Sequence, residues 1–152
     1  MALRGNVTAY DTFTDVDTVK RMALGTYIFT GDAAYVYVQG VTSGAAGKWA
    51  TYTVAGVTVL TVADINGMAG IFMATLDATT KFGFLQVFGI NATADVTAAT
   101  AGAALYATAT GGRLDETVVA GDMALNVSVI VTGASNVATV FLNYPQFIDV
   151  AI

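Results

Sequence analysis

From about Ala33 onward, the chain is a succession of short segments rich in Val, Ile, Thr, Tyr and Phe, separated by turn-forming residues. β-Branched and aromatic residues fit the half-buried pleated surface of a sheet, and strands of about six residues at short, regular spacing are typical of a β-sandwich or barrel. We therefore predict an all-β fold, an antiparallel β-barrel or sandwich, with helix as a minor component at most. The predicted strands cover residues 34–39, 49–54, 57–62, 69–76, 82–89, 103–108, 123–131 and 137–143.

Glycine and proline mark the limits of these segments. Ala55 and Gly56 alone separate two of the predicted strands, which indicates a tight turn. The single proline, Pro145, follows the last predicted strand, where its missing N–H would cost no ladder hydrogen bond.

The first 30 residues differ from the rest of the chain. The acidic residues Asp11, Asp15 and Asp17 lie here, among apolar residues spaced by three or four positions, which is a helical rhythm. Five β-branched residues between positions 7 and 16 oppose a helix. We predict an extended or partly ordered N-terminal arm over residues 1–30 that orders on a partner surface, followed by one β domain over residues 31–152, with a short helix as the alternative for the arm.

The composition argues against catalysis. The chain has no histidine and no cysteine, so the commonest general base, the commonest metal ligand and any thiol nucleophile are missing. Only 11% of its residues are charged, against about 25% in an ordinary soluble domain, as expected of a subunit whose surface is largely covered by neighbours. We predict a non-enzymatic structural protein without catalytic residues, cofactor or metal.

Charge and hydropathy also limit the possible partners. The net charge is −5 and the six basic residues are scattered, whereas nucleic-acid binding requires clustered Lys and Arg. No apolar run approaches the ~20 residues needed to cross a bilayer, and the first residues lack the apolar core of a signal peptide. We therefore expect neither a nucleic-acid partner nor a membrane partner, and synthesis in the cytoplasm.

Three groups of residues carry a possible chemistry. Asp15 and Asp17 would share one face of a strand and could hold a divalent cation, although a solvated acidic arm is the simpler interpretation. Asp115 and Glu116 are adjacent, so on a strand they would point to opposite faces, and we interpret them as the edge of a turn. A glycine-rich stretch over residues 40–47 lacks the Lys-Ser/Thr ending of a phosphate-binding loop.

Aromatic residues form a fourth group. Trp49 with Tyr35, Tyr37 and Tyr52 could form a platform for sugars or bases, but aromatic residues that alternate along strands are more often core or subunit interface.

Several motifs occur in order over roughly residues 33–145. They are Tyr-Val-Tyr-Val-Gln at 35–39, Ala-Gly-Lys-Trp-Ala at 46–50, Phe-Gly-Phe-Leu-Gln-Val-Phe-Gly at 82–89, Ala-Gly-Ala-Ala-Leu-Tyr-Ala-Thr at 101–108, Gly-Arg-Leu-Asp at 112–115, Val-Ala-Gly-Asp at 119–122 and Ala-Thr-Val-Phe-Leu-Asn-Tyr-Pro at 138–145. With this series the chain resembles tailed-phage capsid decoration (cement) proteins and minor head structural proteins.

The resemblance implies a β-tulip or jelly-roll-like barrel, often a homotrimer, that binds the major capsid protein at capsomer junctions on the outer surface of the virion. Residues 1–30 have no counterpart in it. Other phage structural subunits, such as head-fibre, tail or baseplate β-modules, and a carbohydrate-binding β-module remain alternatives. Candidate contacts to the capsid or to other subunits are Leu3, Val7, Tyr10, Phe13, Trp49, Tyr144, Phe147 and Ile148.

Overall fold

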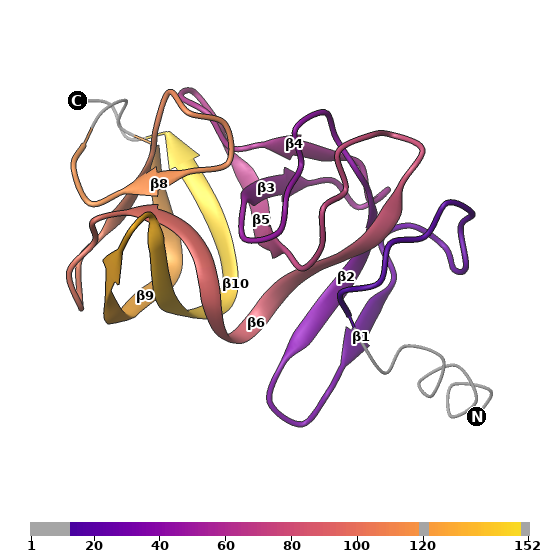
Figure 1. The fold of residues 1–152 in the computed structure, drawn as a ribbon, viewed down its shortest axis with the longest axis horizontal. Coiled ribbons are helices and arrows are strands. Elements are labelled where there is room, and N and C mark those ends of the chain that lie inside the picture. The colour runs from indigo at the N-terminus through magenta and orange to yellow at the C-terminus, as the bar shows by residue number, and fades with distance from the viewer. Residues whose placement is uncertain (1–12, 119–121, 150–152) are drawn as a thin grey trace.

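The computed structural model describes residues 13–118 and 122–149, and this part of the chain contains ten strands and no helix (Figure 1). The all-β prediction is confirmed. The strands are β1 (Tyr27–Phe29), β2 (Ala34–Gln39), β3 (Trp49–Tyr52), β4 (Thr58–Leu60), β5 (Gly67–Phe72), β6 (Phe82–Thr97), β7 (Leu105–Ala107), β8 (Leu114–Asp115), β9 (Asp122–Ala134) and β10 (Val137–Asp149).

All ten strands belong to one sheet, in the order β1-β2-β6-β8-β7-β9-β10-β5-β3-β4. An additional pairing between β6 and β10 closes a ring of five strands, β6-β8-β7-β9-β10. The predicted antiparallel pairing holds for every ladder between the named strands except the one between β6 and β8, which is parallel and makes the sheet mixed.

Strand β6 joins the two halves of the molecule, as Figure 1 shows. It runs on to Thr97, eight residues past the predicted end at Gly89. The second half of β6 contains Asn, Ala and Asp, which are depleted in strands, and this composition hid it from the sequence pattern. Burial of Ala94 and Val96 in the core stabilises it there.

Strand β10 also extends further than predicted, and it contains Pro145. The prediction that this proline follows the last strand is therefore wrong. The ladder between β10 and β9 is irregular between Leu142 and Gln146, so Pro145 lies where a missing N–H breaks no regular pairing.

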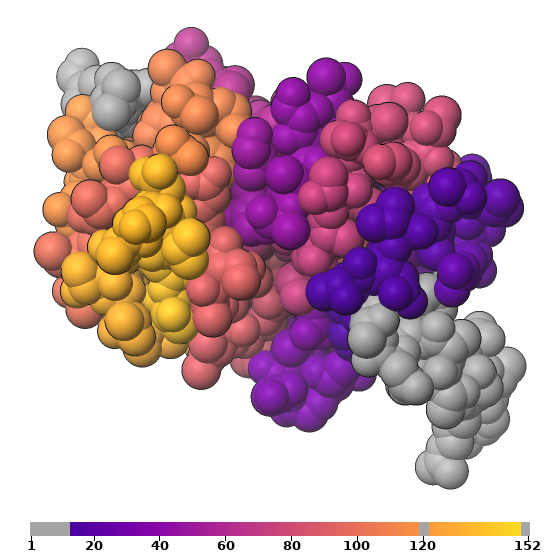
Figure 2. Space-filling model, viewed as in Figure 1, coloured from indigo at the N-terminus to yellow at the C-terminus, as the bar shows by residue number. Residues whose placement is uncertain are grey.

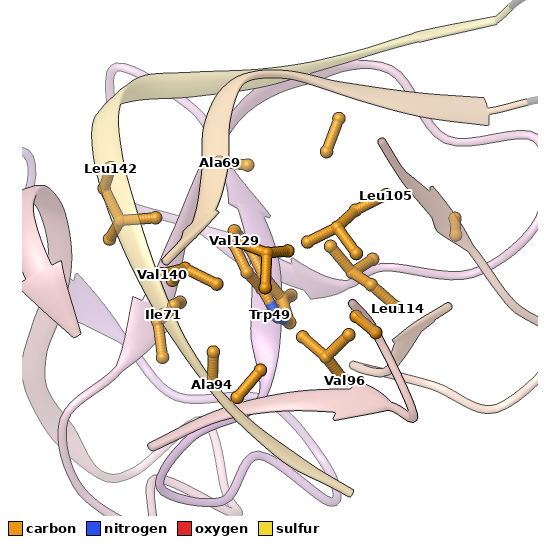
Figure 3. Close-up of a cluster of buried hydrophobic side chains, with 14 of the residues drawn as sticks. Trp49, Ala69, Ile71, Ala94, Val96, Leu105, Leu114, Val129, Val140 and Leu142 are labelled. Atoms are coloured by element: carbon orange, nitrogen blue, oxygen red, sulfur yellow. The ribbon is translucent and has the colours of Figure 1, made fainter. Parts of the chain in front are cut away.

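Two apolar cores lie against the sheet. The larger core surrounds Trp49, which is fully buried among side chains from both halves of the chain, including Val129, Val140 and Leu114 (Figure 3). A second core is built mainly on β2, β5 and the first half of β6. A tight turn between β3 and β4 is confirmed, since the N–H of Gly56 donates to the carbonyl of Thr53 at 2.8 Å and Gly56 has φ of 69°.

The described part of the predicted arm lies on the sheet. Asp17 and Phe82 exchange two backbone hydrogen bonds of 2.8 Å, and β1 pairs with β2 along its whole length. Figure 2 shows these indigo residues in contact with the rest of the molecule. The sheet therefore begins inside the segment that we assigned to the arm, while residues 1–12 lie outside the described part.

Candidate functional site: an exposed aromatic belt

Six aromatic side chains follow one another across the surface from β1 to β10. Contacts join them in two groups. Tyr27 stacks on Phe29 and shares a hydrogen bond with Tyr52, while Phe88 packs against both Tyr144 and Phe141. We call this group the aromatic belt; its members are Tyr27, Phe29, Tyr52, Phe88, Phe141 and Tyr144.

Most of the aromatic belt is open to solvent. The exposed fraction is 66% for Phe29, 44% for Tyr144 and 37% for Phe141, whereas Tyr52 is buried. Ile90 lies opposite Phe141 in the ladder between β6 and β10 and is 63% exposed, which enlarges the apolar surface. Single exposed apolar side chains are common, but a contiguous group of large ones marks an interaction surface.

The register of four strands places the belt. Phe29 of β1 pairs with Ala34 of β2, Ala34 pairs with Phe88 of β6, and Phe88 pairs with Asn143 of β10. The small side chain of Ala34 separates the two phenylalanines in this row. Segments that are more than a hundred residues apart in the chain thus contribute to one surface.

A hydrogen bond fixes the middle of the belt. The hydroxyls of Tyr27 and Tyr52 are 2.6 Å apart. Burial raises the pKa of Tyr52, and its hydrogen bond with Tyr27 and the nearby Tyr144 raise it further. Tyr52 is therefore neutral at ordinary pH, and this part of the belt offers aromatic area and hydroxyl groups.

A second aromatic group lies on the opposite face of β1 and β2, because successive side chains of a strand alternate between faces. Phe13 stacks on Tyr35 with ring centroids 3.8 Å apart, and its edge meets Phe84 at 5.1 Å. Tyr37 packs against Phe84 at 5.2 Å. We call Phe13, Tyr35, Tyr37 and Phe84 the covered cluster, since the N-terminal segment that contains Phe13 packs over it.

Asp17 fixes that covering segment in place. Its side chain is buried, accepts a hydrogen bond of 2.8 Å from the hydroxyl of Tyr37, and lies 2.7 Å from the guanidinium of Arg21. The interpretation of Asp17 as part of a solvated acidic arm is therefore wrong. Because Tyr37 and Arg21 hold its carboxylate, Asp17 stabilises the packing of the covering segment on the sheet.

Three further carboxylates hold loops in place by hydrogen bonds. Glu116 accepts two hydrogen bonds of 2.8 Å from Thr100, and Asp115 accepts one of 2.7 Å from the backbone of Thr117, in agreement with a turn edge. Asp122 is fully buried and accepts hydrogen bonds from the backbone N–H groups of Asp64 and Ile65, which ties that loop to β9. Within residues 13–118 and 122–149, no three acidic side chains gather in a way that could hold a metal ion. In the same residues, no helix is long and apolar enough to cross a membrane.

The candidate contact residues fall into three groups. Leu3, Val7 and Tyr10 lie outside the described residues. Trp49 and Phe147 are 0% and 1% exposed and belong to the core of the chain itself, so the prediction that they contact a partner is wrong for both. The burial of Trp49 agrees with the interpretation of this residue as core and removes the alternative of a sugar or base platform centred on it.

The other three candidates differ in exposure. Tyr144 is exposed and belongs to the aromatic belt, Ile148 is partly buried on β10, and Phe13 is partly buried in the covered cluster.

The sequence alone did not single out Phe29, Ile90 or Phe141. Phe29 and Phe141 each have an apolar neighbour in the chain, and in Phe141-Leu142 the pattern does not tell which of the two side chains faces the core. The structure exposes Phe141 and buries Leu142 completely. The sequence held one signal for the belt, the pair Tyr27 and Phe29. A single residue separates them, and this spacing places both rings on one face of a strand.

No family model, no curated protein and no solved structure matches the chain. The resemblance to phage decoration proteins therefore stays a prediction from the motifs quoted above.

Proposed function

We propose that the protein is a virion structural subunit, a decoration or cement protein that binds the outer surface of a phage capsid at capsomer junctions. Its partners would be the major capsid protein and further copies of itself, as a homotrimer. The observation that carries the proposal is the aromatic belt, an exposed row of large side chains in a chain without histidine or cysteine.

The physical basis of the proposal is contact area. A stable protein interface buries about 1,200–2,000 Å² in total, and aromatic side chains are enriched at its centre, where they contribute most of the binding energy. A trimer would attach three such surfaces at once, and the second and third attachments would be intramolecular. The net charge of −5 disfavours a position beside packaged DNA and favours the outer face of the shell.

The test is co-sedimentation of the purified protein with capsids of the phage that encodes it. We expect binding at a copy number on the scale of the capsid lattice. Replacing Phe29, Phe141 and Tyr144 together by serine should weaken binding by more than about tenfold, since each buried anchor of an interface contributes about 1–2 kcal/mol. Unchanged binding by this triple variant would overturn the role of the belt.

A matched control removes exposed apolar side chains elsewhere. Val54 and Val59 are 85% and 52% exposed and lie on the β3–β4 hairpin, outside the belt. Replacing both by serine should leave binding unchanged. Saturation at only a few copies per particle would favour a vertex, tail or baseplate subunit over a decoration protein.

The N-terminal arm is tested separately. Because Phe13 packs in the covered cluster, the deletion is confined to residues 2–12, which contain the predicted contacts Leu3, Val7 and Tyr10. If the arm grips the capsid, this deletion abolishes capsid binding and leaves the unfolding transition of the β domain unchanged. Retained binding would eliminate the arm as a gripping element.

A further inference from the structure

A hollow lies where the tip of the β1–β2 hairpin meets β6 and β10. Its volume is about 320 Å³, and its walls include Asp32, Tyr35, Gln86, Gly89, Ile90 and Phe141. This volume is at the lower end of the range of about 300–1,000 Å³ for small-ligand pockets, so it suits one long side chain better than a large cofactor.

The hollow has a fixed shape. A Cβ at Gly89, whose φ is 96°, would stand 2.4 Å from the carbonyl oxygen of Asp32, so the hairpin turn rests directly on β6. The ring of Tyr35 is held by its stack on Phe13, with an angle of 9° between the ring planes. A preformed wall lowers the entropic cost of binding a side chain.

The walls of the hollow combine polar and apolar groups. The amide nitrogen of Gln86 donates to the carbonyls of Phe88 and Ile90 at 3.1 and 3.0 Å, and its oxygen accepts from Asn91 at 2.9 Å. These bonds occupy the Gln86 amide. Phe141, Ile90 and the ring of Tyr35 contribute apolar area, and Asp32 is the one acidic residue in the lining.

The charge of Asp32 is not neutralised within the described residues. Three of the six basic residues are engaged by other carboxylates, in the pairs Arg21–Asp17, Lys81–Asp77 and Arg113–Asp95. Asp32 is exposed, and its one hydrogen bond there comes from the hydroxyl of Thr30 at 3.3 Å. The carboxylate also lies close enough to Tyr35 to raise the pKa of that phenol, together with burial.

We infer that this hollow receives an arginine side chain of the protein surface to which the chain binds. The aliphatic part of the arginine would lie on Ile90 and Phe141, and its guanidinium would pair with Asp32 and stack on Tyr35. A guanidinium suits this combination better than an ammonium. Its planar face stacks on aromatic rings, and two of its N–H groups can donate to the two oxygens of one carboxylate. The inference rests on the proposed function for the identity of the partner but not for the existence of the site.

The test is an NMR titration of the full chain with N-acetyl-arginine methylamide. We expect saturable shifts confined to the hollow, most visibly in the Ile90 methyl groups and the Tyr35 ring. The neutral analogue N-acetyl-citrulline methylamide has nearly the same shape and should bind at least tenfold more weakly. Equal binding of both compounds, or shifts spread over the surface, would overturn the inference.

Two variants and a third compound complete the test. Asp32→Asn should reduce the affinity for the arginine compound to that of the citrulline compound. Asp149→Asn, which removes the charge of another exposed carboxylate further along β10, should not change it. Tighter binding of N-acetyl-lysine methylamide than of the arginine compound would overturn the choice of arginine.

The failure of this inference is distinguishable from that of the proposed function. If the hollow binds the arginine compound but the chain does not sediment with capsids, the site stands and the decoration role fails. If the chain binds capsids and Asp32→Asn binds them equally well, the decoration role stands and the hollow has no part in it.

Discussion

The aromatic belt and the covered cluster both include aromatic residues of the β1–β2 hairpin, yet the belt is largely exposed and the cluster is covered. In the covered cluster, Phe84 and Tyr37 are 1% and 0% exposed, because the segment from Phe13 to Arg21 packs over them. In the belt, Phe29 is 66% exposed, since none of the described residues covers it. A face covered by its own chain contributes to stability, whereas an open face is available to a partner.

The largest difference between the two regions should be in stability. Phe84→Ala leaves a cavity in the covered cluster and should lower the free energy of unfolding by about 3–5 kcal/mol. Phe29→Ala removes a largely exposed ring and should cost less than about 1 kcal/mol. Urea unfolding monitored by tryptophan fluorescence measures both, and similar losses would contradict the distinction between the two regions.

The close contact between the β1–β2 hairpin turn and β6 depends on Gly89. Gly89→Ala places a side chain at positive φ and against the Asp32 carbonyl oxygen, so it should cost about 1–3 kcal/mol for the backbone strain and a further amount for the contact. Gly102 has φ of 83° with no atom within 4 Å of its Cβ position, so Gly102→Ala measures the strain alone.

Urea unfolding of the two glycine variants gives the cost of that contact by difference. The amide NMR signals of residues 30–35 should also shift in Gly89→Ala. Equal stability of the two variants would show that the hairpin turn does not rest on β6.

Removing the side-chain contacts of Asp17, which hold the covering segment in place, should have a smaller effect on stability. Asp17→Ala removes the acceptor for the buried hydroxyl of Tyr37 and the ion pair with Arg21, so it should cost about 1–3 kcal/mol. The Arg21 side chain is 51% exposed, which limits the share of the ion pair. A double-mutant cycle with Tyr37→Phe should give a coupling free energy of about 1 kcal/mol, and additive losses would contradict a direct interaction.

The smallest effect concerns alkaline pH. The pKa of Tyr52 is raised in the folded state by burial and by its hydrogen bond with Tyr27. Its contribution to stability is therefore fully present below about pH 10, the pKa of an unfolded tyrosine, and is lost as the pH rises above that value. Tyr52→Phe should flatten the fall of stability above pH 10. Tyr35, whose pKa is also raised, should maintain part of the slope.

Much of the fold followed from local pattern. Residues 34–39 form β2 as predicted, because Tyr and Val alternate there and both prefer strands. The second half of β6 and the last part of β10 were missed, since Ala, Asn, Asp and Pro argue locally against a strand. Pairing partners on both sides stabilise these segments, and no local pattern records such partners.

Less of the candidate site could be predicted. Of the predicted contact residues, Tyr144 is exposed, whereas Trp49 and Phe147 are buried. Large aromatic side chains are equally suited to a core and to an interface, so residue type alone does not separate the two.

The sequence by itself determined that the chain folds as a sheet and that it has neither histidine nor cysteine for catalysis or metal binding. Only the tertiary structure decided which aromatic side chains face outward. Adjacent residues of a strand point to opposite faces, and a shift of one residue in register exchanges those faces. The register of β10 with β6 and β9 was therefore needed to expose Phe141 and bury Leu142, and that register depends on contacts between segments far apart in the chain.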